Sequence, residues 1–177
     1  MFSEIKKISS LLLSVAFSSI GFIASITVTV LAAREVSSNP LFVGFPNAVG
    51  VGGAVLGTRM IYLISKTNSQ LNALAFTFLI GAFGGAIMFY SLIIDSFLLL
   101  LLGAFVLGIG QSATLQTRYA ASFVAGTKFK ATALSLAVWF SVFGSVFGPR
   151  MVGSYSNFFE NIFNSELIVG YVIALVG

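Results

Sequence analysis

Cysteine and histidine are both absent from this chain of 177 residues, and charged residues make up only 8% of it. Without cysteine the chain has no disulfide bond and no thiolate metal site. Without histidine it has no Ser–His or Cys–His catalytic pair and no imidazole ligand for a metal. It also lacks a phosphate-binding G-x-x-x-x-G-K-[ST] loop. We therefore expect no enzyme activity, no metal and no cofactor, and an intramembrane protease of the Ser–His kind is excluded.

The chain consists instead of apolar residues, which account for 58% of the sequence and give a mean hydropathy of +1.05. An ordinary soluble domain is about one quarter charged. The net charge of +4 comes from nine basic residues spread over this apolar chain, and they form no basic patch that would bind nucleic acid. We expect an all-α integral membrane protein that is surrounded by a lipid bilayer.

Short polar segments divide the chain into apolar runs, and a helix needs about 20 apolar residues to cross the hydrocarbon core of a bilayer. The runs cover residues 11–33, 41–65, 73–94, 97–124, 131–153 and 167–177. The last run stops after about 11 residues, which is too few to span. The pattern predicts that residues 1–177 form a single bundle of about six transmembrane helices with the sixth truncated. The chain is then a fragment or the product of a truncated gene.

The basic residues predict the orientation of this bundle, because cytoplasmic loops carry an excess of Lys and Arg. With a cytosolic N-terminus, Arg34 alone among the loop cations lies outside. The residues that then face the cytosol are Lys6, Lys7, Lys66, Lys128 and Lys130. The opposite orientation inverts this bias, so we predict that the N-terminus is cytosolic.

Pairs of glycines four residues apart occur in the second and fifth runs, as Gly53 with Gly57 and Gly144 with Gly148. Residues four apart lie on one face of a helix. Small residues at this spacing let a neighbouring backbone approach closely, in a solvent that supplies no hydrophobic drive for helix association. We predict close helix contacts at these positions.

In the fifth run, Pro149 directly follows Gly148, and Gly153 lies about one turn further on. Pro149 removes a backbone donor, so it is expected to kink the helix or begin to end it. The block from Gly144 to Gly153, G-S-V-F-G-P-R-M-V-G, resembles the helix-5 signature of the major facilitator superfamily, chiefly its drug/proton-antiporter-like branch.

Other parts of the chain match this superfamily unevenly. The segment that begins at Gly108, G-I-G-Q-S-A-T-L-Q-T-R-Y-A-A, resembles helix 4 of some uncharacterised bacterial members. The commoner helix-4 motif has an Arg that drug antiporters often use in proton coupling, and here Ala104 holds that place. The Gly-x-x-x-Asp-Arg-x-Gly-Arg-Arg motif of the loop after helix 2 is largely missing, since only Gly57 and Lys66 match it.

The resemblance implies a function as well as a fold. Members of the superfamily resemble two six-helix bundles in parallel repeat, with the solute site at their interface near mid-membrane. It implies that this chain is the N-terminal half of a secondary active transporter, which moves a small solute by alternating access. The expected partners are the solute and a missing C-terminal six-helix half, and the expected location is the cell membrane, as a bacterial inner-membrane protein.

Polar residues of the first run form one candidate cavity face. Ser14, Ser18, Gly21, Ser25 and Thr29 fall on one narrow stripe at 100° per residue. The stripe fits helix packing through small residues and also fits a polar cavity lining, and the two interpretations are compatible. Ser18, Ser25 and Thr29 are the candidate solute contacts from this run.

The fourth and fifth runs supply the other candidates. Gln111, Thr114, Arg118 and Ser122 share one face of the fourth run. A buried Arg marks a solute pathway or a paired charge, yet no carboxylate lies within any span. The alternative is that Arg118 snorkels to the cytosolic interface. Trp139, deep in the fifth run, is a candidate for stacking against the solute.

Two other functions remain open at this stage. The chain could be an oligomeric six-helix channel or a small transporter of another family. It could also be an inactive truncated membrane fragment or an assembly subunit.

Overall fold

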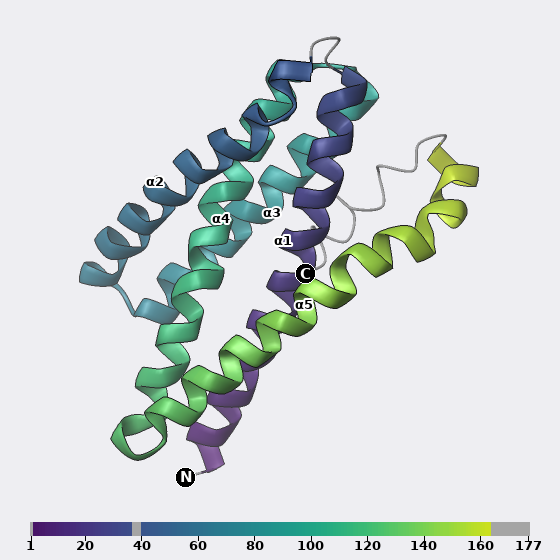
Figure 1. Cartoon of the computed structure of the whole chain (residues 1–177). Coiled ribbons are helices and arrows are strands. Elements are labelled where there is room, and N and C mark those ends of the chain that lie inside the picture. Colours follow the sequence, from purple (N-terminus) through teal and green to yellow (C-terminus); the bar gives the residue numbers. More distant parts are fainter. Residues whose placement is uncertain (1, 37–39, 164–177) are drawn as a thin grey trace.

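The structure, a computed structural model, describes residues 2–36 and 40–163, with side-chain surroundings given for most positions between Ser10 and Arg150 (Figure 1). The described part is entirely helical apart from short connections, which confirms the all-α class. The helices are α1 (Phe2–Val36), the 3₁₀ turn η1 (Pro40–Phe42), α2 (Phe45–Thr67), α3 (Gln70–Ile93), α4 (Phe97–Val124) and α5 (Gly126–Phe163).

Four of these helices contain segments long and apolar enough to cross a membrane. The segments are Ser10–Arg34, Phe45–Thr67, Gln70–Ile93 and Phe97–Val124, and a shorter apolar stretch, Phe129–Gly144, lies in α5. The outward faces are apolar too: Phe83 and Leu98 are 69% and 70% exposed. Side chains of this kind suit a lipid environment, and the chain is a multi-pass membrane protein. The sixth predicted span, 167–177, lies outside the described residues, and the cytosolic N-terminus stays a prediction.

Two loops predicted from the sequence are helical in the structure. Residues 126–130 were expected to form a loop, but Ala125 alone separates α4 from α5, because Gly126 adopts φ +69° and turns the chain in one residue. Residues 154–166 were also expected to form a loop, but α5 continues through Pro149 to Phe163. No glycine or proline follows Gly153 before Phe163, so nothing in this segment stops the helix. Of the two outcomes expected of Pro149, the end of the helix is thus excluded within residues 126–163, and a kink stays a prediction.

The connection between α3 and α4 is a tight turn at Asp95 and Ser96. Asp95 adopts a left-handed conformation with φ 49°, which Asp tolerates better than most residues. The Ser96 hydroxyl then accepts a hydrogen bond from the Leu99 backbone N–H at 3.4 Å and caps α4.

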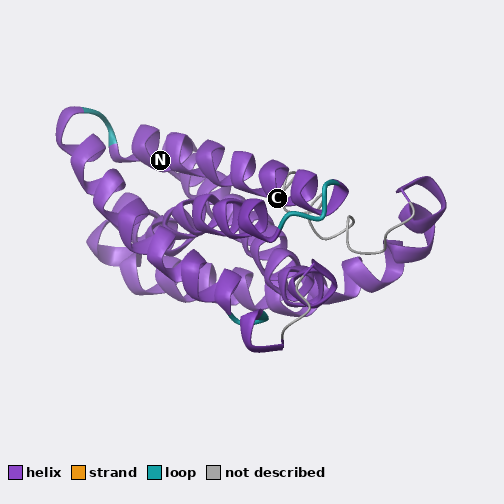
Figure 2. Cartoon of the chain, turned by 90° about the horizontal axis from the view of Figure 1, so that it is seen from above, coloured by secondary structure: helices purple, strands orange, loops and turns teal. Residues whose placement is uncertain are grey.

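Helix α4 is the centre of the bundle. It packs along α2 and α3 and also contacts α1 and α5. Helix α5 in turn crosses and contacts α1 (Figures 1 and 2). Glycines allow this closeness: a Cβ added at Gly81 of α3 would lie 2.7 Å from the Cα of Gly110 in α4.

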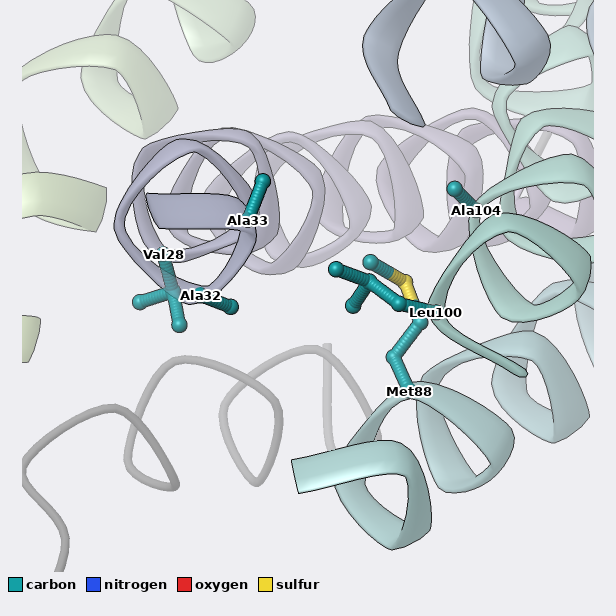
Figure 3. Close-up of a cluster of buried hydrophobic side chains, with 6 residues drawn as sticks. All are labelled: Val28, Ala32, Ala33, Met88, Leu100 and Ala104. Atoms are coloured by element: carbon teal, nitrogen blue, oxygen red, sulfur yellow. The ribbon is translucent and has the colours of Figure 1, made fainter. Parts of the chain in front are cut away.

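A cluster of buried side chains joins α1, α3 and α4, and alanines make up half of it (Figure 3). Met88 and Leu100 are its largest members and are fully buried. The cluster consists of Val28, Ala32, Ala33, Met88, Leu100 and Ala104. Because the alanines are small, the helices approach closely at the end of the bundle toward the α1–α2 connection.

Candidate functional site

A cleft of about 220 Å³ lies between α1, α2 and α4, with Met88 of α3 at its wall. Three polar side chains line it, one from each helix: Thr29, Asn47 and Gln111. The rest of its lining is apolar or glycine, and none of the described residues that line it is charged. The apolar lining consists mainly of Phe22, Ile26, Val51, Met88 and Leu107. A concave, mostly apolar site with a few convergent polar groups is the usual form of a small-molecule site.

The wall of the cleft between α2 and α4 is a contact between two backbones. A Cβ added at Gly108 would lie 2.9 Å from the Cα of Gly50, and one added at Gly50 would lie 3.3 Å from the carbonyl oxygen of Ala104. The two helices run parallel, since later residues of α2 meet later residues of α4 along this contact. Gly50 and Gly108 line the cleft themselves, so the tight contact forms this wall.

The same helix contact continues through the glycine pair that the sequence singled out in the second run. A Cβ at Gly53 would collide with the carbonyl oxygen of Phe105, and one at Gly57 would lie 2.5 Å from the carbonyl oxygen of Ile109. Backbone atoms cannot rotate away as a side chain can. The α2–α4 contact therefore requires glycine at both positions.

Gly144 of the fifth-run pair plays a similar part between α5 and α1. A Cβ there would lie 2.8 Å from the carbonyl carbon of Ser19. Gly148, Pro149 and Gly153 are part of α5, but their surroundings lie outside the described side chains. Close contact at these three positions stays a prediction.

The serine and threonine stripe of α1 divides into packing and cavity positions. Ser18 and Ser25 are buried, and their hydroxyls donate to the carbonyl oxygens of Ser14 and Gly21 at 2.6 and 2.9 Å. Thr29 is also buried and donates to the carbonyl oxygen of Ser25 at 2.6 Å. Of these candidates only Thr29 lines the cleft, so Ser18 and Ser25 lie within helix packing.

The candidate face of α4 is divided in the same way. Gln111 lines the cleft, whereas Thr114 is buried and Arg118 is partly buried, and neither lines it. The Nε atom of Arg118 is buried without a hydrogen-bond partner in the described part of the chain. Gln111 and Arg118 share a face, but they lie two turns apart along the helix, which is roughly 10 Å.

Trp139 is 65% exposed on α5 and does not line the cleft, so the structure does not bring it to the other candidates. Sequence reasoning missed Asn47, Gly50 and Gly108, all of which do line it. A signal for Asn47 was present, because it is the one carboxamide between Leu41 and Ser65.

Comparison with known proteins gives two informative relatives, both from Bacillus subtilis (strain 168). The uncharacterized MFS-type transporter YdeG is 30% identical over 162 residues, which is 92% of this chain and 38% of that protein. The uncharacterized MFS-type transporter YddS is 31% identical over 157 residues, which is 89% of this chain and 36% of that protein.

The chain thus spans well under half the length of these curated relatives. No family model matches the chain, and no solved structure matches it. About nine tenths of the chain aligns with two MFS-type transporters, and its described helices are those of a polytopic membrane protein, so the chain is similar to a part of a major facilitator superfamily transporter.

Proposed function

We propose that this chain is the N-terminal six-helix half of a secondary active transporter that moves a small solute by alternating access. The observation that carries the proposal is the similarity to two MFS-type transporters over about nine tenths of the chain. The cleft between α1, α2 and α4 is its expected contribution to the solute pathway.

The packing supports a division between rigid and moving parts. Contacts through backbone atoms fix α2 to α4 at Gly53 and Gly57, and α1 to α5 at Gly144. Packed elements of this kind are not continuously deformable. The described helices therefore move together, and the alternating motion takes place between this bundle and the second half.

The positions of the cations support a cytosolic N-terminus. Lys66 lies 4.5 Å from the centre of the Tyr62 ring at the end of α2, and Lys130 lies 4.9 Å from the Phe123 ring near the α4–α5 turn. Both follow an even number of crossings from the N-terminus, and Arg34 follows the first. The bias toward one side favours the cytosol for that side.

Ala104 holds the place of the helix-4 Arg that drug/proton antiporters often use in proton coupling. It is 6% exposed within the packed cluster, and its backbone borders Gly50. Ala104 lines the cleft and places no charge there, so it does not supply the cation of the commoner helix-4 motif. We infer that ion coupling, if the transporter is an antiporter, runs through other residues than the one common in drug antiporters.

Reconstitution tests the proposal. The 177-residue chain is purified alone, and also after co-expression with whatever the genome encodes in frame beyond Gly177. Each preparation is placed in liposomes, exposed to a small-molecule cell extract, and assayed by mass spectrometry of the trapped contents. We expect accumulation of a solute only with both parts. Uptake by the chain alone would favour an oligomeric channel, and no uptake by either preparation would favour an inactive fragment.

A further inference from the structure

The cleft exposes two side-chain amides that nothing in the described structure satisfies. Asn47 of α2 and Gln111 of α4 both line it and are only partly buried. Neither side chain forms a hydrogen bond with another described residue, in contrast to the hydroxyls of Ser25 and Thr29, which donate to carbonyl oxygens of α1. Each carboxamide offers two donors and one acceptor oxygen. The two groups are therefore free to bind a molecule in the cleft.

The tight contact between α2 and α4 fixes how these amides are separated. Asn47 lies three residues before Gly50, and Gln111 lies three residues after Gly108, the glycine that Gly50 touches. Since the two helices run parallel and rise about 1.5 Å per residue, the amides are separated by roughly 9 Å along the bundle. Apolar side chains, Ile26 and Val51 among them, line the same cleft.

Charge is absent from this site. No Lys, Arg, Asp or Glu is among the described residues that line the cleft, and Arg118 lies two turns beyond Gln111 on α4. An ion that left water for such a cleft would lose its hydration without gaining a counter-charge, which is costly. A neutral polar group loses far less and regains hydrogen bonds from the amides.

We propose that this cleft selects an uncharged solute that has an apolar body and a neutral hydrogen-bonding group, such as a carboxamide or a hydroxyl, and that Asn47 and Gln111 recognise that group. The solute class rests on the proposed transport function, but binding to the cleft does not require transport. The solute would place its apolar body along Ile26 and Val51 and its polar group at one of the two amides.

A binding experiment with three probes of one size separates charge from shape. The 177-residue chain in lipid nanodiscs is mixed with one of three probes at pH 7. Benzamide is neutral at this pH, benzoate is an anion, and benzylamine is a cation. Saturation-transfer NMR reports which probe contacts the protein. We expect benzamide to bind in the millimolar range, with roughly a three- to tenfold preference over either charged probe.

Substitutions of Asn47 and Gln111 test whether the probes bind in this cleft. The double variant Asn47→Leu/Gln111→Leu should lose the preference for benzamide, and Asn72→Leu, at an exposed amide of α3 away from the cleft, should keep it. Gln111→Glu should shift the preference to benzylamine, because it places an anion in the cleft without changing its shape. These readouts remain interpretable even if one leucine variant folds poorly.

Three results would overturn the proposal: stronger binding of benzoate or benzylamine by the native chain, no binding of any probe, or an unchanged preference in the double variant. None of them bears on flux through the assembled transporter. The failure of this proposal is therefore distinguishable from the failure of the proposed function.

Discussion

Adjacent glycines of α2 provide a direct test of the contact between α2 and α4. A Cβ at Gly53 would collide with the carbonyl oxygen of Phe105 and would lie 2.9 Å from its carbonyl carbon and 3.2 Å from the nitrogen of Ile109. A Cβ at Gly52 would meet nothing within 4 Å. The substitutions Gly53→Ala and Gly52→Ala thus make the same chemical change in the same helix, one in a packed position and one in an open position.

The expected difference in unfolding free energy follows from this geometry. Carbon atoms in contact prefer about 3.5 Å, so α2 would have to move from α4 by about 0.6 Å or more at Gly53. Overpacking of this kind costs about 1–3 kcal/mol. Alanine also favours a helix over glycine by roughly 0.5–1 kcal/mol, but this gain is common to both variants and cancels in the comparison. We expect Gly53→Ala to be about 1–3 kcal/mol less stable than Gly52→Ala.

Equilibrium unfolding of the detergent-solubilised chain by added SDS, followed by far-ultraviolet circular dichroism, measures this difference. Gly52→Ala serves as the control for the effect of alanine on the helix itself. Equal stability of the two variants, or a larger loss for Gly52→Ala, would show that α2 and α4 do not touch at Gly53.

Three further predictions concern α5, α4 and the orientation. Gly144→Leu should separate α5 from α1 and lower stability by roughly 1–3 kcal/mol in the same unfolding assay, whereas Val146→Leu, at an exposed position, should change it little. In the assembled transporter, Arg118→Gln should abolish uptake per inserted molecule, and Arg118→Lys should keep part of it; normal uptake for the glutamine variant would exclude Arg118 from the pathway. For orientation, Ser69→Cys should be protected from an impermeant thiol reagent in intact cells and Ile94→Cys should react, and the reverse pattern would contradict a cytosolic N-terminus.

The sequence predicts the helices of this fold well where the bilayer imposes them. The runs at 73–94 and 97–124 match α3 and α4 within a few residues, because a helix must satisfy every backbone group across the hydrocarbon core. Helix ends that lie outside the hydrocarbon core are predicted less well. Residues 126–130 and 154–163 are polar enough to resemble loops, yet apart from Gly126 they contain no glycine or proline, and hydropathy does not report where backbone hydrogen bonding stops.

The candidate site was less predictable, because it depends on the register between helices. The sequence shows that Gln111 and Arg118 share a face of α4. A helical projection contains no information on the position of a residue along the helix axis, however, and in the structure only Gln111 lines the cleft. Asn47 enters the site because Gly50 meets Gly108, and that pairing is a property of tertiary packing. The sequence identifies which glycines permit close contact without identifying the partner helix.

The described part of the chain does not satisfy the hydrogen-bonding capacity of Arg118. Its Nε is buried without an acceptor in the described part of the chain, and the nearby Ser122 hydroxyl is already committed to the carbonyl oxygen of Tyr119. A buried donor that lacks a partner is costly, and a guanidinium has no neutral form to adopt in a protein. The four candidate spans found among the described residues contain no Asp or Glu, so none of them supplies a counter-charge. The cleft amides and Arg118 therefore make different demands: a neutral hydrogen-bonding group can satisfy the amides, whereas the buried Nε of Arg118 needs an acceptor that the described part of the chain does not supply.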